Sequence, residues 1–237
     1  LIIAPDGPLR LIPFSALHDG KHFLTEKYAL GYVPAISLTD TGETGRESGG
    51  TLIGGLSEER EDFPALRGVE KELDAVRTVT GGKVLLNREF TDENLESEMR
   101  DRDYGILHLA THAIFGGSPE ETYLMTYDDR LTMDELGRLV GLRKYQERQP
   151  ELLTLSACET AMGDERSAFG LAGIALKAGA RSAVATLWSV SDKAAFLIVD
   201  EFYRQLKTSG ISKAEALQSA QKKLIIESRY EHPAFWA

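Results

Sequence analysis

The sequence predicts an α/β fold in which a mostly parallel sheet is flanked by helices on both faces. Short apolar segments that suit buried strands alternate along the chain with segments whose apolar residues recur at helical spacing. The strand segments are apolar throughout, as expected for a sheet that is covered on both faces. Strands that alternate with helices run parallel to one another and are joined by right-handed crossovers.

The first 41 residues are expected to form a strand-rich N-terminal part. Apolar runs at 1–4, 9–12 and 28–33 predict strands, and Asp6-Gly7-Pro8 and Asp19-Gly20 predict tight turns between them. Residues 42–50 are glycine-rich and polar and hold no apolar side chain to bury, so a flexible linker is expected there. The core domain is expected to span residues 51–237.

Within this core, strands and helices are predicted to alternate. Strands are expected at 51–54, 84–86, 106–110, 152–156 and 183–187. Helices are expected at 66–79, 92–100, 133–140, 168–178, 193–206 and 213–226. Thr91 is a suitable N-cap, Thr132 with Glu135 forms a capping box, and Gly81-Gly82 is a helix stop signal.

Composition and charge exclude several functional classes. The 237 residues are 42% hydrophobic and 27% charged, which fits one or two globular domains and disfavours collagen, coiled coils and wholesale disorder. A net charge of −10 disfavours direct binding to nucleic acid or to an anionic membrane surface. The longest stretch without Asp, Glu, Lys or Arg, 104–119, holds two histidines and three glycines, so no segment is expected to span a bilayer.

The single cysteine indicates the cellular compartment, and the N-terminal residues indicate that the chain is part of a longer protein. Cys158 has no cysteine partner within the chain, so no internal disulfide is expected and a reducing cytoplasm fits best. The sequence opens with Leu1 rather than Met and without a signal-peptide pattern, so we expect a fragment of a longer polypeptide whose other part carries regulation.

Two predicted strands end next to reactive side chains. His112 follows the strand at 106–110, and Cys158 follows the strand at 152–156. If these strands are parallel neighbours, both side chains emerge at the carboxyl edge of the sheet, where ligands bind in such folds. An imidazole beside a thiol supports acyl transfer through a thioester, as in a cysteine peptidase. From spacing alone the alternative stays open that Cys158 is a buried structural residue and His112 a loop residue.

Other cysteine and histidine chemistries fit less well. A tyrosine-phosphatase loop requires arginine where the chain has Asp164, and the next arginine is Arg166. A zincin requires glutamate after the first histidine of the pair, but Leu109 follows His108, so no metal site is expected. No organic cofactor is expected either. The glycines of the segment 170–173 give only part of a dinucleotide-binding pattern.

Several motifs, in the same order along nearly the whole chain, resemble those of a CHAT domain. These motifs are LIIAPDGPL at 1–9, IPF at 12–14, HLATHA at 108–113, SACETA at 156–161, LWSVSD at 187–192 and HP at 232–233. CHAT domains are caspase-like peptidase modules of clan CD, mostly bacterial and often fused to TPR repeats. The histidine and cysteine segments also resemble, more distantly, those of caspases and separases.

The resemblance implies a caspase-like (caspase-haemoglobinase) fold and cysteine endopeptidase activity on a protein substrate. His112 is then the general base and acid, and Cys158 the nucleophile. The oxyanion donors are the backbone N–H groups of Cys158 and of Ala113, which stands where many relatives have glycine. TPR repeats in a missing part of the chain, or a partner complex, are expected to gate activity. The alternative is a catalytically idle CHAT interaction or scaffold domain.

The resemblance to separases also implies a substrate pocket. Asp192 stands where separases carry an aspartate thought to receive a basic P1 side chain, whereas the local pattern also fits an aspartate that stabilises a helix N-terminus. Glu159 and Trp188 are further candidates for the substrate cleft, although Glu159 is equally suited to pairing with an arginine and Trp188 also fits a core position. His108 is interpreted as a core histidine. Residues 115–130 are expected to form either a glycine-hinged lid or a surface hairpin.

Overall fold

The structure, a computed structural model, describes residues 1–33, 49–60, 63–114, 121–141, 150–156, 179–186, 188 and 190–237. The chain forms two compact units. The terminal unit combines Leu1–Thr44 with Lys193–Ala237, and the central unit is Gly45–Asp192. The two C-terminal helices therefore group with the N-terminal part, whereas the sequence placed them in the core domain 51–237. The predicted linker falls mostly on residues outside those described.

The central unit alternates strands and helices. In chain order its described elements are β3 (Gly50–Gly55), α2 (Val69–Thr80), β4 (Lys83–Leu86), η4 (Asn87–Glu89), α3 (Asp92–Asp101), β5 (Tyr104–Ala110), β6 (Ala113–Ile114), β7 (Tyr123–Met125), β8 (Arg130–Thr132), α4 (Met133–Gly141), β9 (Leu152–Ser156) and β10 (Ala183–Ala185). The predicted helix at 168–178 and the end of the strand predicted at 183–187 lie outside the described residues.

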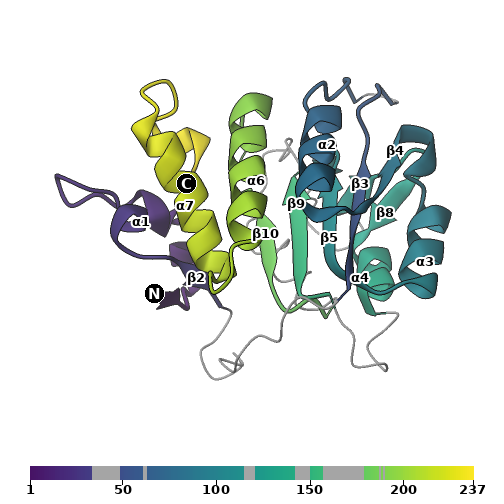
Figure 1. Ribbon diagram of the computed structural model, residues 1–237, viewed down its shortest axis with the longest axis horizontal. Coiled ribbons are helices and arrows are strands. Elements are labelled where there is room, and N and C mark those ends of the chain that lie inside the picture. The colour runs from purple at the N-terminus through teal and green to yellow at the C-terminus, as the bar shows by residue number, and fades with distance from the viewer. Residues whose placement is uncertain are drawn as a thin grey trace. The chain divides into compact units, whose positions relative to one another are not determined.

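A parallel sheet forms the middle of the central unit (Figure 1). Among the described residues, five strands lie in the order β10-β9-β5-β3-β4, and each neighbouring pair is parallel. The register aligns Ile53 of β3 with His108 of β5, and His108 with Thr154 of β9. The predicted α/β class with a mostly parallel sheet is confirmed.

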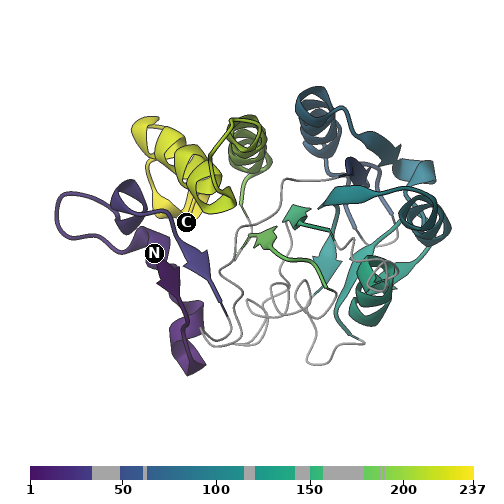
Figure 2. The same ribbon diagram turned by 60° about the horizontal axis from the view of Figure 1, so that its bottom comes forward.

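The two faces of this sheet are covered by different helices (Figure 2). Successive residues of a strand point to opposite faces. On β3, a side chain at Gly55 would meet Val69 and Leu73 of α2, whereas one at Gly54 would meet Phe90 and Leu109. The second face packs on α3 and α4 in one hydrophobic cluster, which includes Leu95, Met99, Leu107, Leu109, Leu136 and Leu139. Glycine in β3 thus permits a close approach of both layers.

A small antiparallel sheet follows β5 in the chain. Its described strands lie in the order β6-β7-β8, and β7 and β8 form a hairpin in which Leu124 lies opposite Leu131. The hairpin alternative predicted for residues 115–130 therefore holds for the part from Tyr123 onwards. Residues 115–120 lie outside the described residues.

The helix ends predicted from local signals are confirmed. The Thr91 hydroxyl accepts a hydrogen bond from the N–H of Asn94 at the start of α3. Thr132 donates from its hydroxyl and its N–H to Glu135 at 2.6 and 2.9 Å, and Glu135 N–H donates back to the Thr132 hydroxyl. Gly81 ends α2 in the left-handed region with φ +70°, where glycine carries no steric cost.

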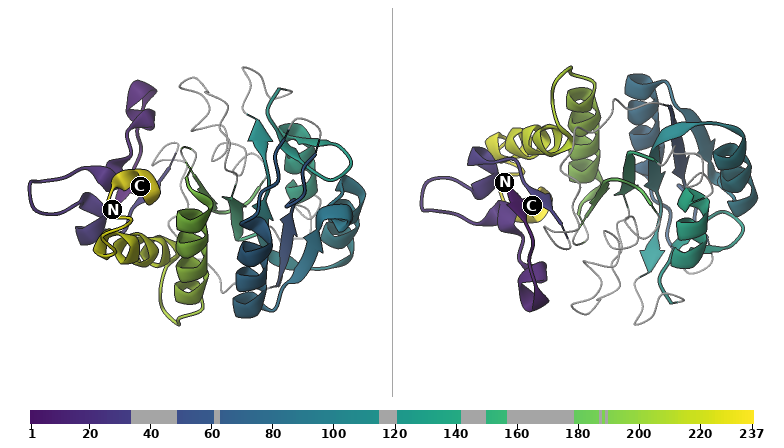
Figure 3. Two further views of the ribbon diagram at one scale, coloured as in Figure 1. Left: turned by 90° about the horizontal axis from the view of Figure 1, so that it is seen from above. Right: turned by 90° about the horizontal axis from the view of Figure 1, so that it is seen from below.

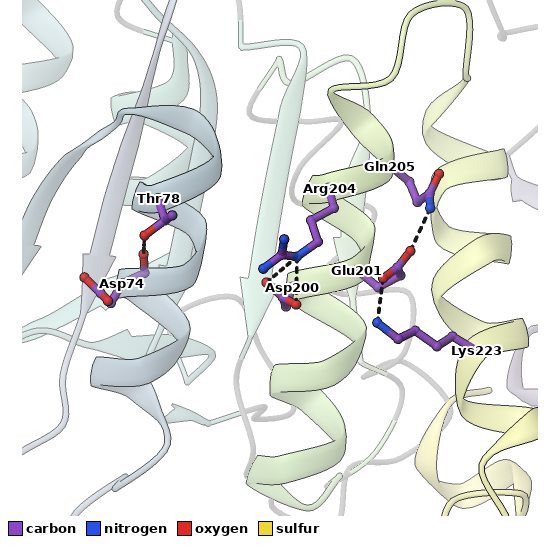
Figure 4. Close-up of polar contacts among 7 residues, drawn as sticks. All are labelled: Asp74, Thr78, Asp200, Glu201, Arg204, Gln205 and Lys223. Atoms are coloured by element: carbon purple, nitrogen blue, oxygen red, sulfur yellow. Dashed lines mark hydrogen bonds and ion pairs between the residues drawn. The ribbon is translucent and has the colours of Figure 1, made fainter.

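The terminal unit gathers both ends of the chain (Figure 3). Its described elements are β1 (Ile2–Ile3), η1 (Gly7–Leu11), η2 (Phe14–Ala16), α1 (Leu24–Lys27), β2 (Gly31–Tyr32), α6 (Asp192–Leu206, from Lys193 onwards), α7 (Lys213–Ile226) and η6 (Pro233–Phe235). A buried polar contact joins α1 to α7, because Thr25 donates to the side chain of Gln221 at 2.6 Å. Lys223 of α7 donates to Glu201 of α6 at 2.7 Å (Figure 4).

The strand predicted at 9–12 is wrong, because this segment belongs to the 3-10 helix η1. Asp6 accepts a hydrogen bond from Gly7 N–H at 2.8 Å, Gly7 adopts φ +51°, and Pro8 occupies the first turn. Proline fixes its own φ near the helical value, so these residues start a helical turn rather than separate two strands. Strands do form at β1 and β2, but they pair in parallel and are shorter than predicted.

No helix in the described part of the chain is long and apolar enough to cross a membrane. The longest of them, α6, has 15 residues and carries charged side chains such as Asp200 and Arg204. These two side chains form an ion pair at 3.0 Å along the helix (Figure 4).

We predict opposite effects for alanine at two glycines. A Cβ at Gly54 would lie 2.4 Å from the Phe90 ring, which is fully buried, so Gly54→Ala should lower the free energy of unfolding by about 1–3 kcal/mol. Nothing lies within 4 Å of a Cβ at Gly137 in α4, so Gly137→Ala should raise it by about 0.5–1 kcal/mol. Urea unfolding measures both, and equal effects would contradict the packing described for β3.

A second prediction concerns the α4 capping box. The hydrogen bonds from the Thr132 hydroxyl and then its N–H lower the pKa of the Glu135 carboxyl. A carboxyl with a lower pKa in the folded state stabilises the fold above its unfolded pKa, near 4.5, and this stabilisation is lost as the pH falls through the folded pKa. Glu135→Gln should therefore flatten the dependence of unfolding free energy on pH below about 4.5. Glu93→Gln, at an exposed position of α3, is the control, and an equal effect there would contradict the prediction.

Candidate active site

The carboxyl edge of the central sheet carries the candidate site. Strands β5 and β9 are parallel neighbours, and their last aligned pair is Ala110 with Ser156. The Thr111 N–H donates to the Ser156 carbonyl at 3.2 Å, so the two chains stay paired one residue beyond this point. The condition stated for the predicted site, that these two strands are parallel neighbours, is therefore met.

His112 lies two residues beyond β5 and is almost completely buried, with 2% of its surface exposed. Its Nε2 lies 2.8 Å from the carbonyl oxygen of Pro64. Because a carbonyl oxygen only accepts hydrogen bonds, Nε2 must carry the hydrogen. In the neutral ring this leaves the basic lone pair on Nδ1. The Phe63 ring packs on the imidazole with ring centroids 5.0 Å apart and planes tilted by 40°.

Phe63 and Pro64 carry no signal in the sequence that marks them as residues of the site. Pro64 acts through a main-chain carbonyl, which every residue type carries, so no residue pattern marks it. The contact joins positions 48 residues apart, beyond the range of any local periodicity.

Ala113 has a backbone compatible with the oxyanion role predicted for it. Asn87 is the one non-glycine residue with positive φ in the described part of the chain, so alanine at position 113 carries no left-handed strain. Ala113 lies opposite Leu124, and the ladder bond beside this pair runs from Met125 N–H to the His112 carbonyl at 2.9 Å. Ala113 and Leu124 thus form a non-hydrogen-bonded pair of the antiparallel ladder.

Two predicted site residues, Cys158 and Glu159, lie outside the described residues. Strand β9 ends at Ser156, two positions before Cys158. The structure therefore describes the histidine side of the predicted dyad and the strand that leads to its cysteine side.

Asp192 lies beside the segment that contacts His112. It is exposed at the first residue of α6, and a Cβ at Gly68 would lie 3.0 Å from its Cβ and 3.4 Å from its Oδ2. Gly68 is the N-cap of α2, four residues after Pro64. One short segment, 63–68, therefore contacts both His112 and Asp192. Trp188 is half-buried between β10 and α6 in the chain.

His108 lies within β5, and its side chain is not at the carboxyl edge of the sheet. It is fully buried on the face of β5 covered by α2, where its Nε2 lies 3.1 Å from Oε1 of Glu72. This position, inside the layer between sheet and helix, agrees with its interpretation as a core histidine.

Tyr104, at the opposite end of β5 from His112, has a raised pKa that comes from its structural surroundings. Burial, together with the Glu98 carboxylate, raises the pKa of the Tyr104 hydroxyl to about 12. Tyr104 is the first residue of β5, so it lies a strand length from the edge that carries His112.

The residues weighed for a tyrosine-phosphatase loop and for a dinucleotide-binding pattern fall outside the described part of the chain. These residues are Asp164, Arg166 and the glycines of 170–173. Within the described ranges, no group of three or more His, Cys, Asp or Glu side chains is arranged to hold a metal ion.

Comparison with protein families gives a match to the CHAT domain that covers residues 1–237, the whole chain. Comparison with curated proteins finds no match.

The buried contact between His108 and Glu72 predicts a stability effect. Glu72→Ala leaves the buried imidazole without this carboxylate and should lower the free energy of unfolding by about 1–3 kcal/mol. Asp74→Ala, on the same helix, removes an exposed ion pair with Arg77 and should cost less than about 0.5 kcal/mol. Urea unfolding compares the two, and equal costs would show that the buried pair does not stabilise the sheet.

Proposed function

The chain belongs to the CHAT domain family, which is caspase-like and peptidase-related, and on this premise we propose that it is a cysteine endopeptidase. Cys158 is the proposed nucleophile and His112 the proposed general base and acid. Its substrate is a protein, and no metal or organic cofactor takes part. The proposed compartment is the reducing cytoplasm, which suits a chain whose one cysteine must stay a thiol.

The register of β5 and β9 is the observation that carries this proposal. Ala110 of β5 is aligned with Ser156 of β9. His112 lies two residues after Ala110, and Cys158 lies two residues after Ser156. Parallel strands end at the same edge of a sheet, so equal spacing beyond an aligned pair supports a juxtaposition of imidazole and thiol. The Pro64 carbonyl, by holding the hydrogen on Nε2, supports Nδ1 as the atom that receives the thiol proton.

The proposed reaction proceeds through a thioester. His112 takes the proton of the Cys158 thiol, and the sulfur attacks the scissile carbonyl carbon. The N–H groups of Cys158 and Ala113 stabilise the resulting oxyanion. The carbon–nitrogen bond then breaks as the imidazolium gives its proton to the leaving amine. Water, deprotonated by His112, hydrolyses the thioester and restores the thiol.

A basic P1 residue is the proposed specificity. Asp192 is exposed and adjoins Gly68, on the same segment that contacts His112, which supports a carboxylate close to the scissile bond. Glu159 and Trp188 are proposed to line the same cleft. We further propose that TPR repeats elsewhere in the protein, or a partner complex, gate the activity.

The test is covalent labelling by peptidyl ketone probes that carry Arg, Asp or Leu at P1, followed by intact and peptide mass measurement. We expect one adduct, on Cys158, formed fastest with the Arg probe and absent in His112→Ala. Asp192→Asn keeps a side chain that suits a helix N-terminus but removes the charge, so it should slow the Arg probe about 10- to 100-fold, as expected for a lost charge-assisted hydrogen bond.

Asp200→Asn is the matched control, because Asp200 lies on the same helix and pairs with Arg204; labelling there should stay unchanged. Preference for the Asp or Leu probe would overturn the role of Asp192 while keeping the peptidase. Absence of labelling, also in the full-length protein with its partners, would overturn the peptidase and favour an idle scaffold domain.

A further inference from the structure

The residues that hold His112 lie outside helices and strands in two described segments, 57–60 and 63–66, which together we call the Pro64 loop. Within it, Phe63 packs on the imidazole and the Pro64 carbonyl accepts its Nε2 hydrogen. The Leu66 N–H donates to the Ser57 carbonyl at 3.0 Å and closes the base of the loop. Ser57 N–H donates to the Asn87 side chain at 2.8 Å, so the base is tied to the end of β4.

Arg60 holds the Pro64 loop in place. Arg60 and Phe63 exchange two backbone hydrogen bonds, at 3.1 and 2.8 Å, so the position of Phe63 depends on that of Arg60. The Arg60 guanidinium donates to the Tyr127 carbonyl at 2.6 Å and lies over the Tyr127 ring, 4.1 Å from its centroid. Stacking and a hydrogen bond to the same residue give this side chain one defined orientation.

Tyr127 is itself anchored close to the site. Its N–H donates to the carbonyl of the fully buried Phe90 at 2.8 Å. Two residues earlier, Met125 N–H donates to the His112 carbonyl at 2.9 Å. The contacts therefore close a ring that runs from the His112 backbone through Met125, Tyr127, Arg60 and the Pro64 loop back to the His112 imidazole.

Within this ring, Arg60 supplies the side-chain link between the hairpin β7–β8 and the Pro64 loop. The other links of the ring are made by the main chain, by neighbours along the chain, or by the His112 side chain. We propose that Arg60 is a positioning residue for His112: it holds the Pro64 carbonyl where it keeps the hydrogen on Nε2 and the lone pair on Nδ1. The expected effect on turnover rests on the proposed peptidase function, whereas the expected effect on the His112 tautomer does not.

The test compares Arg60→Met, which keeps an unbranched side chain of similar length, with Arg60→Lys, which keeps the charge and one donor nitrogen but loses the planar guanidinium. Arg130→Met is the matched control, because Arg130 also lies over a tyrosine of the same hairpin, 4.9 Å from the Tyr123 centroid, and is not part of the ring described above. Thermal unfolding establishes that each variant is folded. If Arg60→Met does not fold, Arg60→Lys decides the outcome.

The first measurement needs no substrate. Nitrogen NMR of protein labelled at its five histidines reports the tautomer of each ring, and His112→Asn identifies the His112 signals. We expect the Nε2–H tautomer in the wild type, a mixture of both in Arg60→Met, and partial recovery in Arg60→Lys. An unchanged tautomer in Arg60→Met would overturn the proposal, whether or not the protein proves to be a peptidase.

The second measurement is turnover of the substrate class found with the ketone probes. Because a displaced general base weakens proton transfer more than substrate binding, Arg60→Met should lower kcat about 10- to 100-fold and change KM less than twofold. Arg60→Lys should recover part of the loss, and Arg130→Met should match the wild type. A loss confined to KM, or an equal loss in Arg130→Met, would overturn the positioning role. A wild type without turnover would overturn the proposed function alone.

Discussion

The parallel pairing of β5 with β9 is the constraint on which the candidate site depends. A slip of one residue in β5 would turn every one of its side chains to the opposite face. His108 would then leave Glu72, and Leu107 and Leu109 would leave the cluster formed with α3 and α4. Because both faces are buried, the register has one solution. That register determines how far His112 extends beyond the last aligned pair.

Two histidines four residues apart differ in position: His108 lies within β5, and the proposed general base His112 lies beyond its end. His108 lies within the ladder, where the sheet and α2 enclose it and its Nε2 lies 3.1 Å from the Glu72 carboxylate. His112 lies beyond the ladder, where its orientation comes from a loop rather than from the pleat. A residue just beyond a strand is anchored by the sheet, but its side chain is not confined to one of the two sheet faces. Such a position suits the role of general base proposed for His112.

The described residues of the Pro64 loop are held by hydrogen bonds although they belong to no helix or strand. Its hydrogen bonds run to Asn87, Tyr127 and its own backbone, and Asn87 adopts a left-handed backbone with φ 50°, a conformation that asparagine tolerates better than most residues. The same segment leads into α2 and adjoins Asp192 at Gly68. The proposed base, His112, and the proposed specificity carboxylate, Asp192, therefore both lie against the same segment, 63–68.

The sequence alone determined the types and order of most elements, the parallel sheet, the caps at Thr91 and Thr132, and the two strand ends that carry the candidate dyad, because periodicity and capping act between residues close in the chain. Local apolarity misjudged 9–12, where Pro8 and Gly7 impose a helical turn. Only the tertiary structure decided that the C-terminal helices join the N-terminal unit, that His108 meets Glu72, that His112 meets the Pro64 carbonyl and that Arg60 meets Tyr127. These contacts join distant positions, several through main-chain carbonyls, which carry no signature in the residue type.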